Sequence, residues 1–388
     1  MKINICGGGP SGLYFALLAK KYLPNVEKVT VYEQNPKDAT FGFGIVLADR
    51  GLDRLKRADK ESHDLIVAAS FQSRNRIITH RGRKIFIEGG GYGGAIARLR
   101  LLQILQECCD RAGIEVHYNA RLEVGQLADD ADLLVGADGV NSAVRKSYEE
   151  EFGVTSYNLN AKLAWYGTRA HFPYPILSFK KTELGYFWVA AYAYTESMGT
   201  FVAECDGETW KRSGLSEMNE EEARRFSEEI FADELQGEKL ICNKSLWNSL
   251  PVTRVKHWSV GNRVLIGDAL HSAHPSIGSG TRIAMEDSIA LFEALRDNND
   301  VPSALAAFRR NREPAKQKLV DAAEKSIAWY ESVTPRIESM DAVEFVFDFL
   351  MRTGRIDEAR LTAEYPHFMA KYHREWRDFN AKHRLQTA

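Results

Sequence analysis

The sequence predicts an α/β protein in which a discontinuous, Rossmann-like nucleotide-binding domain carries an inserted antiparallel β-sheet domain and ends in a C-terminal helical region. A strand–helix–strand pattern opens the chain, which is typical of the start of a doubly wound sheet. Residues 160–205 alternate between apolar and polar side chains over several short strands. Most of the chain after residue 303 has helical periodicity.

These changes in character give the expected domain boundaries. We assign residues 1–70, 90–160 and 255–310 to the nucleotide-binding domain, 71–89 and 161–254 to the β-rich domain, and 311–388 to the helical region. Within them we expect a glycine-punctuated loop over residues 40–47, one helix over 51–70 and one amphipathic helix over 217–235.

The composition is that of an ordinary globular protein. The 388 residues are enough for several packed units, and the formal net charge of −2 gives no reason to expect a nucleic-acid or membrane-surface partner. No apolar run reaches about 18 residues, and the first six residues are too short for a signal peptide. We therefore expect a cytoplasmic monomer or homodimer that acts on a small molecule.

The cysteines argue against a disulfide framework and against a metal site. Their number, five, is odd, and no two of them form a CxxC pair. Cys6 ends an apolar strand, where packing in the core is the expected role. We expect no bound metal.

The first glycine-rich turn follows the strand predicted at residues 2–6. Gly7 would let the chain turn tightly, Gly9 would let a pyrophosphate approach the backbone, and Gly12 would let the next helix pack closely on the sheet. The N-terminus of that helix presents free N–H groups and a partial positive charge to phosphates. Glu33 ends the next strand, where a carboxylate can accept hydrogen bonds from ribose hydroxyls.

Two further turns follow predicted strands later in the chain. Asp138 and Gly139 form one of them, and Asp138 is suited either to cap the next helix or to face a nucleotide group. Gly267 and Asp268 form the other, and Asp268 can accept hydrogen bonds from a ribityl or ribose chain. This segment leads to a helix expected over residues 278–296, whose first amides can face developing negative charge.

A fourth glycine-rich stretch, residues 89–94, also follows a strand and precedes a helix. It fits either a second dinucleotide site or a flexible crossover into the helix expected from Arg98. We favour the crossover, because five glycines in six residues lower the order of the segment and no complete second β-α-β unit surrounds it.

Together these motifs resemble those of the single-component, group A FAD-dependent aromatic hydroxylases, which share the fold of p-hydroxybenzoate hydroxylase. The family pattern is an N-terminal GxGxxG, an RxxLLxxL helix, a DG motif, and GDxxHxxxPxxGxG with a late Asp. The chain matches it, over about residues 1–300, at Gly7, Gly9, Gly12, Arg98, Leu101, Leu102, Leu105, Asp138, Gly139, Gly267, Asp268, His271, Pro275, Gly278, Gly280 and Asp287.

The resemblance implies a bound, non-covalent FAD, with NADH or NADPH as a transient co-substrate and O2 as the oxidant. In this family a flavin C4a-hydroperoxide delivers oxygen to an electron-rich ring. The first domain is then the FAD-binding domain and the β-rich domain the substrate domain. The residues expected at the FAD are Gly7, Gly9, Pro10, Ser11, Gly12, Glu33, Gln34, Gly44, Arg98, Asp138, Gly139, Asp268, Pro275, Gly278, Ser279, Gly280 and Thr281.

The ring of the substrate is expected against the β-rich domain. Residues 186–192 alternate with period two, which places four of the candidate pocket residues on one face of a strand. The same face could instead be ordinary sheet core. The candidate pocket comprises Phe43, Trp165, Tyr186, Trp188, Ala190 and Tyr192, and the candidate catalytic residues are His274, Pro275 and Tyr192.

A closer similarity is to the branch with salicylyl-CoA 5-hydroxylase, 2-aminobenzoyl-CoA monooxygenase/reductase and the tryptophan hydroxylase of violacein synthesis. It is carried by residues 40–47, 165–168, 200–205, 276–281 and 329–331. The branch tends to have Phe at the position of Pro275 and His at that of Ala190. The similarity implies a hydroxy- or amino-benzoyl-CoA substrate. The alternatives are a small free aromatic such as tryptophan or indole, an NAD(P)H oxidase or reductase, and a non-catalytic flavoprotein.

A CoA thioester would need basic side chains near its phosphates. The residues Arg309, Arg310, Arg312, Lys316 and Lys318 are candidates on one predicted helix. They could equally form an ordinary solvated helix face, which is the interpretation we favour.

Overall fold

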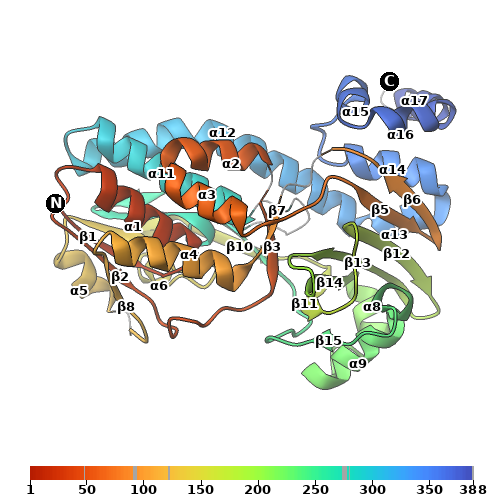
Figure 1. Cartoon of the computed structure of the whole chain (residues 1–388), viewed down its shortest axis with the longest axis horizontal. Coiled ribbons are helices and arrows are strands. Elements are labelled where there is room, and N and C mark those ends of the chain that lie inside the picture. Colours follow the sequence, from red (N-terminus) through yellow and green to blue (C-terminus); the bar gives the residue numbers. More distant parts are fainter. Residues whose placement is uncertain (48, 91–93, 121–122, 273–277, 279, 387–388) are drawn as a thin grey trace.

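The computed structural model describes residues 1–47, 49–90, 94–120, 123–272, 278 and 280–386. Two sheet-based parts lie side by side, and the long helix α12 (Val301–Glu331) runs from one to the other (Figure 1). The N-terminus lies at the outer edge of the first part, and the C-terminal helices cover the second part. The mixed α/β class with several sheets and C-terminal helices is confirmed.

A six-stranded sheet forms the centre of the first part. All of its pairings are parallel except the one at the edge between β17 and β18. In spatial order its strands are β17 (Ser259–Val260), β18 (Arg263–Leu265), β9 (Leu133–Gly136), β1 (Lys2–Cys6), β2 (Lys28–Tyr32) and β8 (Glu115–His117). Segments far apart in the chain therefore place their carboxyl ends at one edge of the sheet, where doubly wound folds bind ligands.

The helix α1 (Pro10–Tyr22) lies between α4 (Arg98–Arg111) and α11 (Gly280–Asp297). It is buried along nearly its whole length, so it is an internal helix with no solvent-facing stripe. On the same part of the molecule lie α2 (Asp49–Ala58), α3 (Lys60–Ala68), α5 (Val124–Asp129), α6 (Ala143–Ser147), α7 (Glu149–Phe152) and the short 3-10 helix η1 (Gly267–Ala269).

A seven-stranded sheet forms the second part. Its pairings are antiparallel except that β12 runs parallel to β5, a strand from early in the chain. In spatial order the strands are β15 (Leu240–Ile241), β11 (Lys162–Thr168), β14 (Gly199–Cys205), β13 (Gly185–Ala193), β12 (Ile176–Thr182), β5 (Arg76–His80) and β6 (Arg83–Ile87).

Each face of this sheet packs against a different set of helices. Phe187, Val189 and Phe201 point to a core completed by α8 (Gly207–Arg212), α9 (Glu220–Ile230) and α10 (Ala232–Leu235). Phe179 and Trp188 point the other way, into a core shared with the C-terminal helices. Those helices are α12, α13 (Val333–Ser339), α14 (Ala342–Met351), α15 (Glu358–Glu364), α16 (Pro366–Lys371) and α17 (His373–Gln386).

Two small sheets join the parts. One consists of β3 (Gly44–Leu47), β7 (Gly94–Ala97) and β4 (Phe71–Gln72), and the other of β10 (Val154–Asn158) and β16 (Pro251–Val255). The expectation of a loop over residues 40–47 is therefore wrong for its second half, because that half pairs with β7.

Two long helices expected from the sequence are each divided. The segment 51–70 forms α2 and α3, because the Asp59 side chain caps α3 by accepting a hydrogen bond from the Ser62 amide. The segment 217–235 forms α9 and α10, which meet at Phe231. By contrast α12 is continuous through residue 310, where the sequence suggested the start of the helical region.

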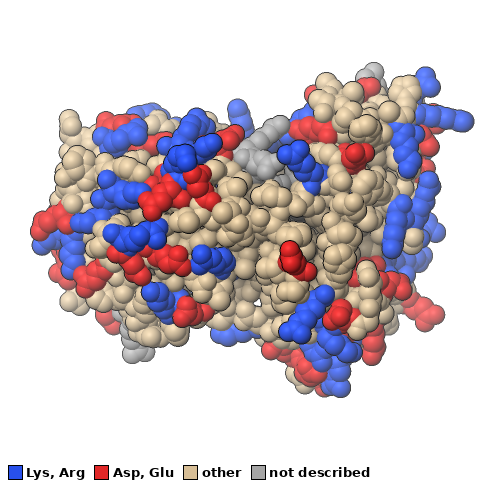
Figure 2. Space-filling model, viewed as in Figure 1, with Lys and Arg blue, Asp and Glu red and all other residues tan. Residues whose placement is uncertain are grey.

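None of the described helices has the length and apolar character needed to cross a bilayer. On the face shown in Figure 2, basic and acidic side chains are interspersed, and uncharged residues dominate the region between the two parts.

Gly12→Ala should destabilise the ligand-free protein. A Cβ at residue 12 would lie 2.0 Å from the backbone oxygen of Gly7, and overpacking of this kind costs about 1–3 kcal/mol. Gly9→Ala is the matched control, since a Cβ there meets no atom within 4 Å and the φ of −76° suits alanine. Urea denaturation measures both free energies of unfolding. Equal values for the two variants would contradict the packing account.

Candidate active site

The three glycine motifs of the sequence meet at the carboxyl edge of the six-stranded sheet. Gly7 follows β1, Glu33 follows β2, Asp138 follows β9 and Asp268 follows β18. Because β18, β9, β1 and β2 are consecutive neighbours in the sheet, these four residues line one edge. The sheet topology therefore assembles a single site from segments more than 250 residues apart.

The turn between β1 and α1 leaves backbone donors open to a ligand. Gly7 has a φ of +108°, which favours glycine, and the Gly8 amide donates to Glu33 Oε2 at 2.7 Å. No side chain caps α1, whose N-cap residue Gly9 has open space where a Cβ would be. An uncapped helix N-terminus with an accessible backbone suits a phosphate group.

Glu33 is held in place by its neighbours. Besides the bond to Gly8, its Oε1 accepts hydrogen bonds from the backbone and side-chain nitrogens of Asn35, at 2.8 and 2.7 Å. Gln34 is exposed, and Ser11 is buried, where its backbone oxygen accepts a hydrogen bond from Ser288 of α11. Ser11, which was expected at the FAD, thus joins α1 to α11 through its backbone oxygen.

Asp138 has one engaged oxygen and one free oxygen. Its Oδ2 accepts hydrogen bonds from the amides of Ala143 and Val144, at 2.6 and 3.2 Å, at the start of α6. Its buried Oδ1 has no partner among the described residues, and burial raises the pKa of this carboxyl. Gly139, with a φ of +78°, has open space beside it. Capping therefore uses half of the carboxylate, and the other half is available to a ligand.

Asp268 and Arg98 lie near each other at the cleft. Asp268 lies deep in the protein, but its side chain is still accessible to solvent. A residue that lines a cleft has both properties. Burial raises the pKa of Asp268, while His271 and Arg98 act in the opposite direction. The Nε of Arg98 is buried and has no hydrogen-bond partner in the described part of the chain. Burial also lowers the pKa of Arg98.

These observations fit a bound FAD. Buried polar groups without partners are rare in folded proteins, so Asp138 Oδ1 and Arg98 Nε call for a polar ligand. The open space beside Gly9, Gly139 and Gly278 lies along the motifs that resemble an FAD site. FAD carries the phosphates and hydroxyl groups that such donors and acceptors would satisfy.

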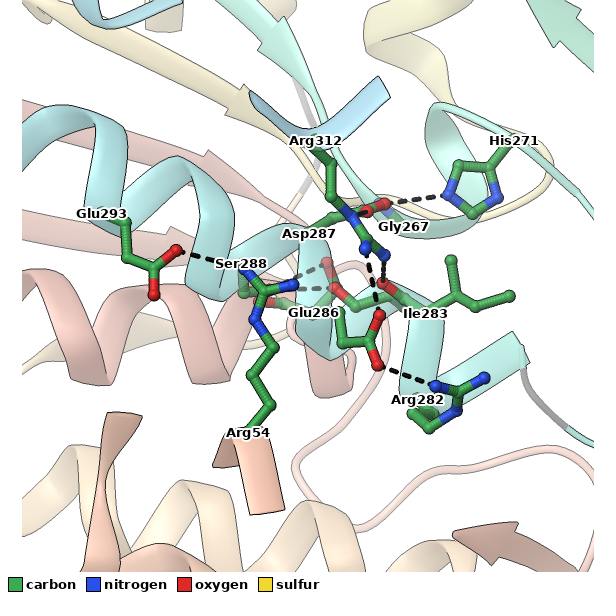
Figure 3. Close-up of polar contacts among 12 residues, drawn as sticks. Arg54, Gly267, His271, Arg282, Ile283, Glu286, Asp287, Ser288, Glu293 and Arg312 are labelled. Carbon is green, nitrogen blue, oxygen red and sulfur yellow. Dashed lines mark hydrogen bonds and ion pairs between the residues drawn. The ribbon is translucent and has the colours of Figure 1, made fainter. Parts of the chain in front are cut away.

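Behind this cleft lies a cluster of buried charges centred on Asp287 of α11 (Figure 3). Its Oδ2 accepts from the Gly267 amide at 3.2 Å and contacts His271 Nε2 at 2.9 Å, and its Oδ1 accepts from Arg312 Nε at 2.7 Å. Arg312 also pairs with Glu286 at 3.0 Å. Burial alone would raise the pKa of Asp287, but His271 and Arg312 outweigh it and hold that pKa well below its usual range.

Lys316 lies one turn beyond Arg312 on α12 and is also buried. Its Nζ is 4.1 Å from the centre of the Trp258 ring, which is a cation–π contact. Together with His271, Ser272 and Arg254 it lines a cavity of about 20 Å³, large enough for about one water. Arg312 and Lys316 therefore belong neither to a solvated face nor to a pocket mouth, and both interpretations offered by the sequence are wrong for them. Arg309 pairs with Glu313 on the surface.

The loop before β3 meets the seven-stranded sheet. Tyr192 donates its hydroxyl hydrogen to the Gly44 oxygen at 2.9 Å, and the Gly44 amide donates to Thr200 Oγ1 at 2.8 Å. The Trp165 ring packs against Gly42, and its buried Nε1 has no partner among the described residues. Phe43 packs against the glycine at 167 on β11. The structure thus brings Phe43, Gly44, Trp165 and Tyr192 together.

The other candidate pocket residues lie further along the same face. Trp188 is 1% exposed, donates to Glu204 at 3.0 Å and packs against Tyr330 of α12. Tyr186 lies near the far end of β13, where its hydroxyl bonds to Glu338 of α13. Ala190 is partly buried and follows Trp188 on the same strand face, before Tyr192. Trp188 and Tyr186 thus also serve the packing of the C-terminal helices.

Part of the expected site cannot be placed. His274, Pro275 and Ser279 lie outside the described residues, whereas Gly280 and Thr281 begin α11. The sequence analysis did not identify Glu204, Glu286 or Arg254 as residues of this region. Only the spacing of Arg312 and Lys316, four residues apart on one helix face, could have suggested a shared burial.

Comparisons with known proteins point to the same cofactor. The model of the FAD binding domain family matches residues 1–323. Salicyloyl-CoA 5-hydroxylase of a Streptomyces species is 34% identical, over 91% of this chain and 70% of its own length. Protodeoxyviolaceinate monooxygenase of Chromobacterium violaceum is 32% identical, over 90% and 94%.

A third relative is the 3-hydroxy-4-methyl-anthranilyl-(aryl-carrier protein) 5-monooxygenase of Streptosporangium sibiricum, 29% identical over 94% and 97% of the two chains. Among solved structures, a tetrameric form of 2-methyl-3-hydroxypyridine-5-carboxylic acid oxygenase aligns with a TM-score of 0.71. It covers 94% of this chain and 95% of its own at 19% identity, so it supports the fold.

The buried charge of Lys316 should make stability depend on pH. Burial lowers the pKa of Lys316 from 10.5 to about 8. Between these values the unfolded chain holds a proton that the folded protein has released, so the free energy of unfolding rises with pH. Between pH 7 and pH 10.5 the free energy of unfolding of the wild-type protein should therefore rise by about 3 kcal/mol more than that of Lys316→Met.

Urea denaturation of both proteins at several pH values measures this difference. Lys318→Met is the control, because Lys318 is exposed on the same helix and should show no such trend. Parallel pH profiles for wild type and Lys316→Met would contradict the burial of a titrating amine.

Proposed function

Because the chain belongs to the FAD binding domain family, we propose that it is an FAD-dependent monooxygenase that hydroxylates an electron-rich aromatic ring. The ring would be a hydroxy- or amino-benzoyl group carried as a thioester of coenzyme A. The net reaction consumes the arene, O2, NAD(P)H and a proton, and yields the hydroxylated arene, water and NAD(P)⁺.

Bound FAD would supply the chemistry that passes two electrons from NAD(P)H to O2. The chain's own residues bind and position it. The open N-terminus of α1 would hold the pyrophosphate, Glu33 the ribose, and Asp268 the ribityl chain. The free oxygen of Asp138 and the Nε of Arg98 are further donor and acceptor positions in the same cleft.

The single observation that carries the proposal is the junction between the Gly44 loop and the substrate-domain sheet. Hydrogen bonds between Gly44 and the side chains of Tyr192 and Thr200 fix this loop on β13 and β14, and Phe43 and Trp165 add aromatic surface beside it. An aromatic ring held there would be shielded from water, which hydroxylation requires because activated oxygen is otherwise lost. Tyr192 is a positioning residue in this arrangement, since its hydroxyl is engaged with the loop.

The thioester is supported by two relatives. Salicyloyl-CoA 5-hydroxylase and the anthranilyl-(aryl-carrier protein) 5-monooxygenase are both named for aryl groups attached to a carrier. A carrier supplies remote binding energy that can hold a small ring in a productive position. A free aromatic acid lacks that handle and should be held less firmly.

Turnover of carrier-linked and free substrates tests the proposal. The FAD-loaded protein should hydroxylate salicyloyl-CoA or 2-aminobenzoyl-CoA with a kcat/KM at least tenfold above that for salicylate, anthranilate or tryptophan, because the tail adds binding energy. The measurement is product formation by mass spectrometry alongside NAD(P)H consumption.

Each other outcome has its own meaning. Equal or faster turnover of a free acid or of tryptophan would refute the thioester and leave the hydroxylase. NAD(P)H consumption with peroxide but no hydroxylated product, for every compound, would refute the hydroxylase and identify an oxidase.

A further inference from the structure

The small cavity beside Lys316 takes no part in the proposed hydroxylation. It measures about 20 Å³ and lies between α12, the turn after η1 and the strand β16. Its polar lining residues are Arg254, His271, Ser272 and Lys316, and the others are apolar side chains of α11 and α12. The volume suits a single particle of about the size of a water molecule.

Lys316 brings a positive charge to this cavity without a counter-ion. The residue is 9% exposed, and its Nζ makes no ion pair and no hydrogen bond with any residue that the structure describes. Its contact with the Trp258 ring, at 4.1 Å, offsets only part of the cost of removing an ammonium group from water. A buried charge of this kind favours a partner of opposite sign.

The carboxylates around Lys316 are already paired with arginines. Arg312 bridges two of them on α11, and the other pairs lie nearer the surface. Four carboxylates face four guanidinium groups, so the ammonium of Lys316 is one extra positive charge among the described groups of this region. The pairs are Asp287 with Arg312, Glu286 with Arg282, Glu313 with Arg309 and Glu324 with Arg254.

His271 and Arg254 form the other polar walls of the cavity. His271 contacts Asp287 through Nε2 at 2.9 Å, so Nδ1 is the ring nitrogen without a hydrogen-bond partner in the described part of the chain (Figure 3). In the protonated ring Nδ1 is a donor, as is every nitrogen of the Arg254 guanidinium. The Ser272 hydroxyl is already engaged by backbone groups of β16, and no carboxylate lines the cavity among the described residues.

The cavity has a route to the surface. Arg254, Ser272 and Val320 are partly exposed, whereas His271 and Lys316 are buried. An ion that enters between the exposed residues would therefore meet partners that are shielded from water. Shielding strengthens the attraction between opposite charges and protects it from screening by salt.

We propose that this cavity binds one small monovalent anion of the size of chloride, with the Lys316 ammonium as its principal partner. A water molecule would fill the space but would leave the ammonium without a counter-charge. The inference goes beyond the proposed function, since it requires neither a substrate nor oxygen. His271 belongs to the turn that presents Asp268, so a bound anion would support that turn from the side opposite the FAD cleft.

The stability of the FAD-loaded protein in chloride tests the assignment. Urea denaturation at pH 7 and constant ionic strength compares sodium chloride with sodium gluconate, whose anion is too large for the cavity. Chloride should stabilise the wild type in a saturable manner, because it binds only the folded state. Lys316→Met should raise the apparent dissociation constant for chloride at least tenfold, since a charge-assisted contact is lost.

Lys318→Met is the matched control and should respond to chloride as the wild type does. Lys318 is exposed on the same helix and does not line the cavity. Circular dichroism checks that each variant is folded. Equal stability of the wild type in chloride and gluconate would overturn the proposal, and so would an equal effect of chloride on Lys316→Met and wild type.

The pH dependence separates this site from a general effect of salt. Burial lowers the pKa of Lys316 to about 8, and the anion needs the charged amine, so stabilisation by chloride should fade between pH 7 and pH 10. Carboxylates and guanidinium groups do not ordinarily change charge in this range. The other charged groups that face Lys316 are Asp287 on α11, Arg312 and Glu313 on α12, Arg254 on β16 and His271 across the cavity.

Bromide locates the ion directly, without any substitution in the protein. Crystals of the FAD-loaded protein, soaked in sodium bromide at a concentration that saturates the stability change, should show an anomalous peak between Lys316 Nζ and His271 Nδ1. A water molecule in the cavity with bromide absent would contradict the assignment. Stabilisation by chloride that persists unchanged at pH 10 would contradict it as well.

Discussion

The buried carboxylate of Asp287 joins three parts of the chain that meet behind the cleft. It accepts a hydrogen bond from the Gly267 amide, contacts His271 and pairs with Arg312 of the long helix α12. The turn that presents Asp268 is therefore tied to α11 and to α12 at one point. Since α12 continues to the part of the molecule that holds the seven-stranded sheet, the same contact relates the FAD cleft to the sheet that would hold the ring.

The contribution of this cluster is better described as positioning than as net stability. Placing ions in a protein interior carries a desolvation cost that can match or exceed their attraction, whereas removal of one partner leaves a costly unpaired charge. An arrangement of this kind tolerates few alternative geometries, and Asp287 and Arg312 are both almost completely buried. The turn at Gly267 should accordingly have one conformation in the folded protein, as a site that binds a cofactor precisely in one orientation requires.

Sequence reasoning succeeded where the signal is local. The strand–turn–helix at residues 2–22 and the strand ends before Asp138 and Asp268 follow from glycine, apolar runs and helix periodicity within short windows. Once those strands are taken to be parallel neighbours, their carboxyl ends must meet, so the cleft could be predicted from the sequence. The break at Asp59 was also readable in principle, since Asp is one of the residues favoured at a helix N-cap.

The rest depends on contacts between distant segments. Arg312 and Lys316 look like solvent-facing residues in sequence. In the structure α11 supplies Asp287 and Glu286 opposite the buried Arg312, and the Trp258 ring lies against the amine of Lys316. The alternation at residues 186–192 correctly indicates one strand face, but which helices cover it depends on how α12 and α13 pack. Trp188 and Tyr186 therefore meet Tyr330 and Glu338, and the assignment of the ring pocket stays a prediction.

The most direct test of the central role of Asp287 is the affinity of the apoprotein for FAD in Asp287→Asn, Arg312→Met and the double variant, measured by fluorescence quenching under conditions where each is folded. The account predicts that Asp287→Asn raises the dissociation constant at least tenfold. It also predicts that the double variant is no worse than Asp287→Asn, because both changes break one shared contact. An unchanged affinity in folded Asp287→Asn, or losses in the two single variants that simply add, would contradict it.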